Sequence, residues 1–351
     1  MKLQSTLIRL QQHLAAENHS LCLIEDPVDL LYLTGVQLSA GALYVSQKDA
    51  YLFVDGRYVE IAKQKSVIPA FLHSEKALES FIDMVKATTL AFDSAKTSYD
   101  RYEALKNFAK KQTLTLVPCS NLLKSIRAIK NGEELEKMRQ SAALLWRGFM
   151  HLQSYIRVGI SERELALIFE FYCRKEGAEK LAFEPIIAFG VHSALPHHRA
   201  GEALLKPGEH VLVDIGVVLN HYHSDMTRVL FPPGVDSFFN DKYLLVQEAA
   251  HAALRLCKPG VAIKELDLAA RAVFQRENME TYFIHSLGHG IGLETHEFPL
   301  IKHTGKDKDF CLKAGMVITI EPGLYFEGKG GLRYEDTIII TENGYDNLYP
   351  Q

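Results

Sequence analysis

The sequence predicts an α/β domain over residues 1–122, followed by an α+β domain over residues 123–351 with pseudo-twofold halves. Three observations lead to this fold class. Short helical and strand patterns alternate through the first third of the chain, as in small α/β domains. A long helical pattern begins after Asn131 and opens the second domain. That domain then runs twice through the order helix, helix, acidic hairpin.

In the first domain, apolar spacing predicts helices that alternate with short apolar strands. Gly35 and Gly41 mark turns before the second and third strands. Helices are expected over residues 2–17, 57–65, 75–86 and 98–110, and strands over residues 20–24, 41–46, 50–54, 89–92 and 114–117.

In the second domain, cap residues mark where the helices begin and end. Asn131 is a suitable N-cap for the first helix, and Ser161 with Glu164 has the spacing of a capping box for the second. The second helix is expected to end near Gly177. Two further helices fit residues 238–257 and 263–277.

Four acidic residues lie in segments that otherwise have the composition of buried strands. They form two pairs, Asp214 with Asp225 and Glu321 with Glu335. Each segment is expected to form an antiparallel hairpin, with the members of a pair equidistant from its turn. Residues so placed face each other on one side of the sheet. The two segments cover residues 210–231 and 315–341.

Neighbouring carboxylates in an apolar environment repel each other, and burying them unpaired is costly. A pair of divalent metal ions between them would balance the charge. The alternative is that the acids lie on a solvent-exposed face. Asp225 alone could do so, but Asp214 and Glu321 have apolar flanks that leave little room for such a face. We therefore favour a metal site.

A glycine-rich loop over residues 284–299 is expected to supply a third element of this site. We expect His289 to be the metal ligand, because imidazole suits Mn, Co, Fe or Zn, and the glycines around it allow close approach of the backbone. The loop contains His285, His289 and His296. Its spacing fits neither a dinucleotide fingerprint nor an HExxH zinc motif, and the chain has no GxSxG elbow.

A second histidine cluster lies in residues 191–199, VHSALPHHR. Its simplest interpretation is a surface loop with solvated imidazoles, and we keep that interpretation for His198.

The overall composition is that of an ordinary globular protein. Hydrophobic residues make up 47% and charged residues 23%, and the net charge of −4 suggests neither a nucleic-acid nor a membrane partner. The five cysteines are scattered without a CxxC motif, which favours a reducing cytoplasm. We find no signal-peptide pattern and no apolar run long enough to span a bilayer.

Taken together, several motifs resemble the pita-bread metallopeptidase family, which includes Xaa-Pro aminopeptidases, Xaa-Pro dipeptidases (prolidases) and methionine aminopeptidases. The N-terminal phrases YLTG and VDGRY, with IRAIKNGEELEKMR, resemble the Xaa-Pro branch specifically. The resemblance covers essentially the whole chain and implies a pita-bread fold for the second domain. The other matching motifs are SALPHH, VDIG, SDMTR, HSLGHGIGLETHE, ITIEPG and LRYED.

The resemblance implies two divalent metal ions, and all of the family's ligands are present in this chain. Asp225 and Glu335 would bridge the ions, which would share a hydroxide that attacks the scissile carbonyl. An oxygen-rich site favours Mn²⁺, with Co²⁺, Fe²⁺ or Zn²⁺ possible by availability. The implied ligands are Asp214, Asp225, His289, Glu321 and Glu335.

The resemblance also implies roles for the residues around the metals. Glu321 would be the general base and His296 would stabilise the oxyanion. His197 would contact the substrate near the scissile amide, and His285 would shape the pocket. Arg333 lies two residues before Glu335, so it would share a strand face with that carboxylate and support it.

Our first expectation is a Mn-dependent cytoplasmic Xaa-Pro aminopeptidase that acts on short proline-containing peptides as a homodimer. The close alternative is an Xaa-Pro dipeptidase, which must hold a free carboxylate beside proline. Prolidases often carry an arginine just after the HE-x-P stretch, where this chain has Leu300 with Lys302 nearby, and this favours the aminopeptidase. A binding module with a vestigial site is a further alternative, although the intact ligand set argues against it.

Overall fold

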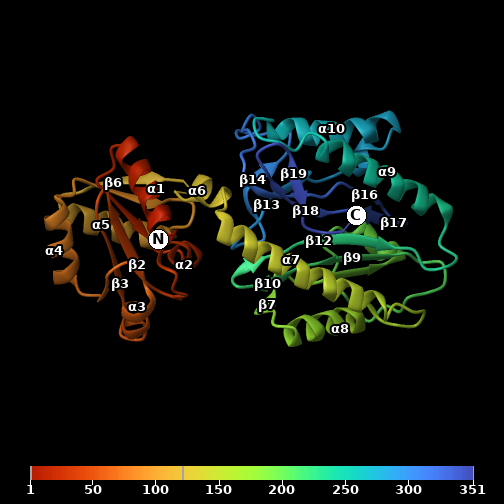
Figure 1. Ribbon diagram of the computed structural model, residues 1–351, viewed down its shortest axis with the longest axis horizontal. Coiled ribbons are helices and arrows are strands. Elements are labelled where there is room, and N and C mark those ends of the chain that lie inside the picture. Colours follow the sequence, from red (N-terminus) through yellow and green to blue (C-terminus); the bar gives the residue numbers. More distant parts are fainter. Residues whose placement is uncertain (1, 121, 351) are drawn as a thin grey trace. The chain divides into compact units, whose positions relative to one another are not determined.

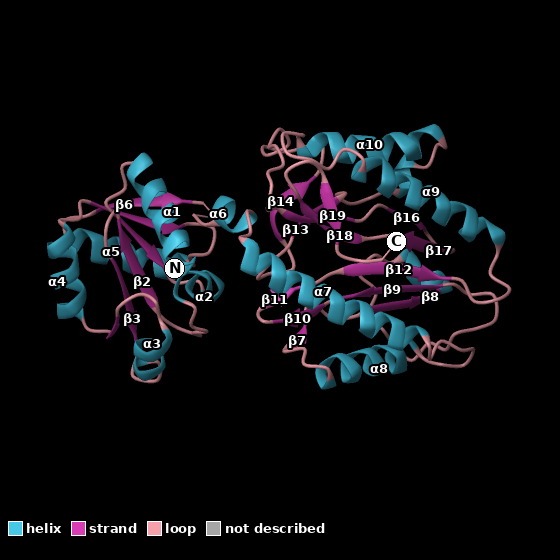
Figure 2. Cartoon of the chain, viewed as in Figure 1, coloured by secondary structure: helices cyan, strands magenta, loops and turns pink. Residues whose placement is uncertain are grey.

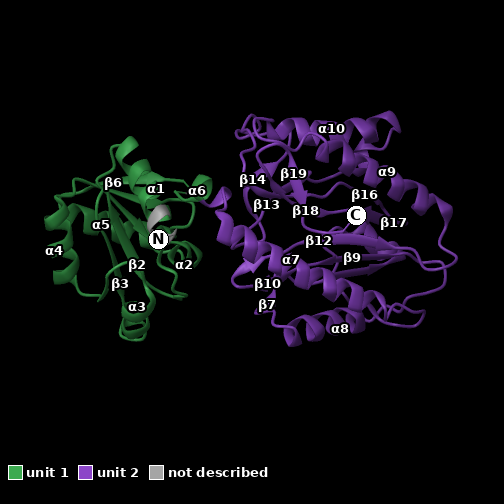
Figure 3. Ribbon diagram, in the orientation of Figure 1, with its two compact units in different colours: residues 1–126 green, residues 127–351 purple. Residues whose placement is uncertain are grey.

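The computed structural model describes residues 2–120 and 122–350. The chain forms two compact units, residues 1–126 and 127–351 (Figure 3). The boundary that the sequence predicts lies between residues 122 and 123. No helix in the described ranges is long and apolar enough to cross a membrane.

The first unit is a six-stranded sheet with helices packed against it (Figures 1 and 2). Its strand order is β4-β3-β2-β1-β5-β6, and parallel and antiparallel pairs are mixed. The helices are α1 (Lys2–Ala16), α2 (Pro27–Thr34), α3 (Val59–Lys65), α4 (Glu75–Val85) and α5 (Tyr99–Lys111). The strands are β1 (Leu21–Ile24), β2 (Ala42–Ser46), β3 (Ala50–Val54), β4 (Ala70–Leu72), β5 (Thr89–Asp93) and β6 (Thr115–Cys119).

The expected helices and strands of this unit are confirmed, and two elements were missed. The first is α2, although Asp26 caps it by accepting from the backbone N–H groups of Val28 and Asp29. Pro27 at the first helical position is a further start signal. The second is β4, which has three residues and no alternating pattern.

The second unit contains the four long helices that the sequence predicts. The helix α6 (Lys124–Ala128) spans the boundary between the units. The long helices are α7 (Gly132–Gln153), α8 (Glu162–Lys175), α9 (Ser237–Leu254) and α10 (Ile263–Arg276). The first strands are β7 (Lys180–Leu181), β8 (Ile186–Phe189), β9 (Val211–Ile215), β10 (Val217–Leu219), β11 (Tyr222–His223) and β12 (Met226–Leu230). The later strands are β13 (Gly288–Gly290), β14 (Glu297–Ile301), β15 (Val317–Ile320), β16 (Gly323–Phe326), β17 (Gly330–Arg333), β18 (Asp336–Ile340) and β19 (Tyr345–Asn347).

The core of this unit has two parts that follow the two expected halves. In one part, apolar residues of α7 and α8 pack against the sheet β12-β9-β8. In the other, residues of α9 and α10 pack against the sheet β14-β13-β15-β18-β19. An isolated bridge between Thr227 and Glu335 joins the two halves. The two-halved α+β architecture is therefore confirmed.

The register of the first acidic hairpin differs from the expected one. Asp214 pairs with Thr227 rather than with Asp225. The turn lies at Asn220 and His221, which both have positive φ, at 51° and 68°, as a two-residue type I′ turn requires. This places the turn centre one residue later than predicted. Asp225 lies two residues before Thr227, so it keeps the same face as Asp214 but sits diagonally from it.

The second acidic hairpin has the expected register. Gly323 pairs with Arg333 in β16–β17, and Ile320 pairs with Asp336 in β15–β18. Both pairings place Glu321 directly opposite Glu335. The turn centres on Gly328, whose φ of 69° suits a residue without a Cβ atom.

Candidate metal centre and active site

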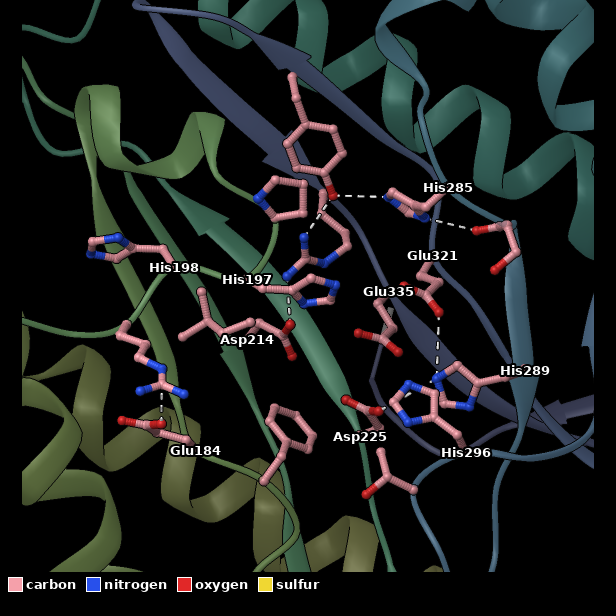
Figure 4. Close-up of a pocket in the computed structure, with 18 of the residues that line it drawn as sticks. Glu184, His197, His198, Asp214, Asp225, His285, His289, His296, Glu321 and Glu335 are labelled. Carbon is pink, nitrogen blue, oxygen red and sulfur yellow. Dashed lines mark hydrogen bonds and ion pairs between the residues drawn. The ribbon is translucent and has the colours of Figure 1, made fainter. Parts of the chain in front are cut away.

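A cavity of about 430 Å³ opens in the second unit, and every site residue expected from the sequence lines it (Figure 4). The carboxylates come from the two acidic hairpins, and the histidines come from the loop that precedes β9, from β13 and from the loops that flank β13. The expected residues are His197, Asp214, Asp225, His285, His289, His296, Glu321, Arg333 and Glu335.

The floor of the cavity is a buried cluster of acids around one histidine. Asp225, His289 and Glu335 each offer a ligand atom, and these atoms lie within 4.8 Å of one another. The Nε2 atom of His289 is 3.4 Å from Oε1 of Glu321 and 3.8 Å from Oδ2 of Asp225. Residues from three separate elements thus converge on one small volume.

These carboxyl groups resist ionisation. Burial raises the pKa of Asp225, and the nearby carboxylates of Glu335, Asp214 and Glu321 raise it further. Burial and the carboxylate of Glu335 likewise raise the pKa of Glu321. Burial and the carboxylate of Asp214 raise the pKa of Glu335 to about 8. The cluster therefore needs protons or cations to balance its charge.

Two atoms of the cluster are suited to bind a metal ion. Oδ1 of Asp225 is buried and has no hydrogen-bond partner within the described ranges. His289 must donate from Nδ1 to the carbonyl of Gly290, 2.9 Å away, because a carbonyl only accepts. Burial lowers the pKa of His289 to about 4, so Nε2 carries a lone pair at neutral pH. The donor set therefore fits a divalent metal ion.

A hydrogen-bond network supports the carboxylates from behind. Arg333 donates to Oδ2 of Asp214 at 2.5 Å, to the hydroxyl of Tyr325 at 2.6 Å and to Oγ1 of Thr227 at 3.1 Å. Thr227 in turn donates to Oε2 of Glu335 at 2.7 Å. This arrangement fixes the orientation of carboxylates from both hairpins. Thr227 and Tyr325 are not among the site residues predicted from the sequence, although Thr227 shares a strand face with Asp225.

His285 forms part of the wall through the same network. Its Nδ1 donates to the carbonyl of Ser286, so its Nε2 accepts from the hydroxyl of Tyr325 at 2.9 Å. Burial, followed by the charge of Arg333, lowers the pKa of His285 to about 4. The imidazole is therefore neutral and held in one orientation at neutral pH.

His296 and His197 lie closer to solvent. The ring of His296 is 4.3 Å from the ring of His289, measured between centroids. Burial lowers the pKa of His296, and the neighbouring His197 lowers it further. His197 itself is exposed and lines the same cavity. Both imidazoles can therefore reach a peptide that enters the cavity.

The loop that carries His197 is anchored by a buried glutamate that is not among the site residues predicted from the sequence. Oε1 of Glu162 accepts from Phe189 N and His192 Nδ1, and Oε2 accepts from His198 Nε2 and Gly201 N, at 2.8–3.1 Å. Burial alone would raise the pKa of Glu162, but these bonds, led by that from His198, lower it. The interpretation of His198 as a solvated surface residue was therefore wrong.

The three side chains of this anchor also lie close enough to hold a metal ion. However, each oxygen of Glu162 already accepts two hydrogen bonds, whereas Oδ1 of Asp225 accepts none within the described residues. Hydrogen bonds from the protein thus satisfy both acceptor oxygens of Glu162, whereas the cluster on the cavity floor keeps an unpaired acceptor among the described residues.

The glycines around His289 allow close packing between backbones. A Cβ atom at Gly288 would clash with the carbonyl of Thr319, and one at Gly290 would clash with the carbonyl of Phe298. At Gly292 it would lie 2.8 Å from Oε2 of Glu297. The close approach predicted at these positions is therefore to neighbouring strands and to Glu297.

Comparisons with known proteins bear on this site. The model of metallopeptidase family M24 matches residues 136–342, and that of the creatinase/prolidase N-terminal domain matches residues 7–129. The chain is 37% identical over 328 residues to an Xaa-Pro dipeptidase of Pyrococcus furiosus, covering 93% of this chain and 92% of that relative.

Solved structures of Xaa-Pro peptidases share the fold of this chain. An Xaa-Pro dipeptidase from Bacillus anthracis superposes with a TM-score of 0.94 at 30% identity, covering 100% of this chain and 99% of that one. An X-Pro aminopeptidase from Thermotoga maritima superposes with a TM-score of 0.88 at 30% identity, covering 98% of each chain.

Proposed function

Because this chain belongs to metallopeptidase family M24 and is a metallo-exopeptidase with a pita-bread second domain, we propose that it is an Xaa-Pro dipeptidase. It would hydrolyse the bond between a first residue and a C-terminal proline. This proposal replaces the expectation of an Xaa-Pro aminopeptidase, which Leu300 favoured. Support for the revision comes from the relatives named Xaa-Pro dipeptidase, which match along almost the whole chain.

The observation that carries the proposal is the unbalanced donor cluster on the cavity floor. Two divalent ions held there would polarise the scissile carbonyl and supply a water of lowered pKa. Support comes from the unpartnered Oδ1 of Asp225, the lone pair of His289 and the raised pKa values of the carboxyl groups. The proposed ligands are Asp214, Asp225, His289, Glu321 and Glu335.

The remaining side chains would bind and orient the peptide. Glu321 is suited to accept a proton, because burial raises its pKa above the usual range of a carboxyl group. His296 would donate to the carbonyl oxygen as charge develops there. His197 would contact the substrate beside the scissile bond. Arg333 would keep Asp214 and, through a threonine hydroxyl, the opposite hairpin in position.

An Xaa-Pro bond suits this arrangement. Its nitrogen carries no N–H group, and proline restricts the conformation of the residue before it. A site that acts on the carbonyl from a fixed cluster does not need that N–H group. Phe183, Ile186 and Leu300 line the same cavity and would accept the apolar pyrrolidine ring.

An Xaa-Pro aminopeptidase is the second candidate. Leu300 favours it, because family dipeptidases often carry an arginine after the HE-x-P stretch. The Thermotoga maritima structure also shows that this fold is shared with a protein named X-Pro aminopeptidase. The use of manganese, the homodimer and the cytoplasmic location stay predictions from the sequence.

The experiment that separates these candidates compares an Xaa-Pro dipeptide with a longer peptide that begins with the same Xaa-Pro pair. Metal-loaded enzyme should cleave the dipeptide and leave the longer peptide largely intact. Cleavage of the longer peptide at its first bond, with the dipeptide slower, would favour the aminopeptidase. Cleavage of neither peptide by metal-loaded protein would contradict both.

A further inference from the structure

One wall of the cavity carries an ion pair that the proposed chemistry does not use. Arg199 Nε lies 3.6 Å from Oε2 of Glu184, and both residues line the cavity (Figure 4). The two side chains are 84% and 66% exposed. Exposed pairs at this separation contribute little to stability, so a substrate group can replace either partner.

The guanidinium of the other arginine of the cavity already donates hydrogen bonds to protein groups. Arg333 is buried and donates to Asp214, Tyr325 and Thr227, so its guanidinium supports the site from within the protein. The imidazole of His285 is neutral at neutral pH, as its pKa is about 4. Among the described residues that line the cavity, Arg199 is therefore the arginine whose guanidinium is available to an anion.

The backbone on both sides of Arg199 is held in place. Its neighbour His198 donates to the buried carboxylate of Glu162, and the N–H group of Gly201 donates to the same carboxylate oxygen. The Cα position of Arg199 is thus fixed by a buried anchor, while its side chain extends into solvent. The backbone therefore positions the guanidinium at the edge of the cavity, while the exposed side chain can still change its conformation to meet a ligand.

A dipeptide that binds in the cavity would bring an anion with it. Its proline carries a free carboxylate, whereas a longer peptide has an uncharged amide there. A planar guanidinium matches a carboxylate with two parallel hydrogen bonds, and an apolar side chain such as Leu300 offers none. The difference between the two substrates is therefore one charge beside the pyrrolidine ring.

We propose that Arg199 is the specificity-determining residue that binds the C-terminal carboxylate of the dipeptide, and that Glu184 holds its guanidinium until the substrate arrives. The inference rests on the proposed dipeptidase function. Binding exchanges the Glu184 carboxylate for the substrate carboxylate, and no covalent bond changes. Recognition of a free proline carboxylate would then come from the loop between β8 and β9 rather than from the strand that holds Leu300.

The test uses the metal-loaded full chain and an Xaa-Pro dipeptide. Arg199→Gln should raise KM by about 10-fold or more, as expected for lost hydrogen bonds to a charged group, while kcat changes little. Inhibition by free proline should weaken in parallel, so that proline no longer binds better than prolinamide, which has a neutral amide in place of the carboxylate. Arg199→Lys should recover part of the loss, because it keeps the charge without the planar geometry. Glu184→Gln should lower KM by about 2-fold, because it removes the competing carboxylate.

A matched control is Arg163→Gln, which removes another exposed arginine, paired with exposed Glu202 outside the cavity. This variant should leave KM and both inhibition constants unchanged. If the wild-type enzyme cleaves the dipeptide and Arg199→Gln keeps its KM and its preference for proline over prolinamide, the Arg199 assignment alone is wrong. If the wild-type enzyme cleaves only longer peptides, the proposed function fails first, and the carboxylate role fails with it.

Discussion

The Nε2 atom of His289 faces Oε1 of Glu321 at 3.4 Å, while Nδ1 of the same ring donates to the carbonyl of Gly290. Because burial lowers the pKa of His289 to about 4, Nε2 carries no proton at neutral pH. Two lone pairs would then face each other if Glu321 were ionised. A cation or a proton must lie between them, which is the physical basis of the proposed metal site.

This relationship predicts how pH affects the stability of metal-free protein. Burial raises the pKa of Glu335 to about 8, whereas an unfolded glutamate ionises near about 4.3. Between those values the folded chain keeps a proton that the unfolded chain has lost, so stability falls as pH rises. The raised pKa values of Asp225 and Glu321 act in the same direction.

Buried histidines act in the opposite direction at lower pH. The pKa values of His210, His223, His285 and His289 are lowered to about 4, so their contribution to stability rises with pH until about 6.5. Between about pH 6.5 and about pH 8, the carboxyl groups should therefore determine how the stability of the metal-free protein changes with pH. We expect the Tm of chelator-treated protein to fall across that window, and bound metal to remove the fall. A Tm that rises there without metal would contradict the assignment.

His296→Ala should keep the bound metal and lose most of the turnover. One preorganised partner of an oxyanion contributes roughly 10²–10³ in kcat. The side chain lies beside His289 without being one of the proposed ligands. Elemental analysis and steady-state kinetics on the same sample check this. Unchanged kcat with reduced metal content would instead give His296 a structural role.

Thr227→Val should weaken metal binding by about 10-fold or more, because outer hydrogen-bond partners tune ligands on this scale. The change removes the hydroxyl that accepts from Arg333 and donates to Glu335, and it hardly alters the volume of the side chain. Metal titration of the metal-free protein measures the effect. The control is Thr34→Val, another buried threonine, whose hydroxyl donates to the backbone carbonyl of Leu30 in the first unit. Equal metal affinities in the two variants would argue against a role for Thr227.

Glu162→Ala should destabilise the second unit by about 1–3 kcal/mol or more, because it leaves the buried N–H group of Phe189 and the partly buried one of Gly201 without their acceptor. Urea denaturation gives the free energy of unfolding. Glu164→Ala is the matched control on the same helix, since the Glu164 side chain is exposed and lies 3.6 Å from Arg157. That variant should stay within about 0.5 kcal/mol of wild type. Similar losses in both variants would show that the anchor contributes little.

Local patterns in the sequence predicted the long helices and the second acidic hairpin. Gly328 fixed the centre of that hairpin, because its position at the turn favours a residue that adopts positive φ. The first hairpin was shifted because His221 is not a usual residue for a type I′ turn. Helix α2 was missed although Asp26 and Pro27 gave a start signal.

The parts of the site that the sequence did not predict depend on contacts between distant segments. Thr227 reaches Glu335 across 108 positions, and Glu162 reaches His198 across 36. Thr227 belongs to the motif SDMTR, but that motif does not indicate that its hydroxyl reaches Glu335, and Glu162 belongs to none of the quoted motifs. The carboxylates were predictable for the opposite reason, because an acid within an apolar strand is itself unusual.

The central claim, that the cavity floor is a metal centre that hydrolyses Xaa-Pro, is tested most directly by measuring metal content and dipeptide turnover in Asp225→Asn. The variant keeps the shape of the side chain and removes the charge of the carboxylate whose Oδ1 has no partner in the described ranges. Asp309→Asn is the control, because Asp309 is a surface acid paired with Lys264. We predict two metal ions per chain and full turnover for the wild type and the control, and fewer ions with no turnover for Asp225→Asn. Full turnover and unchanged metal content in Asp225→Asn would contradict the account.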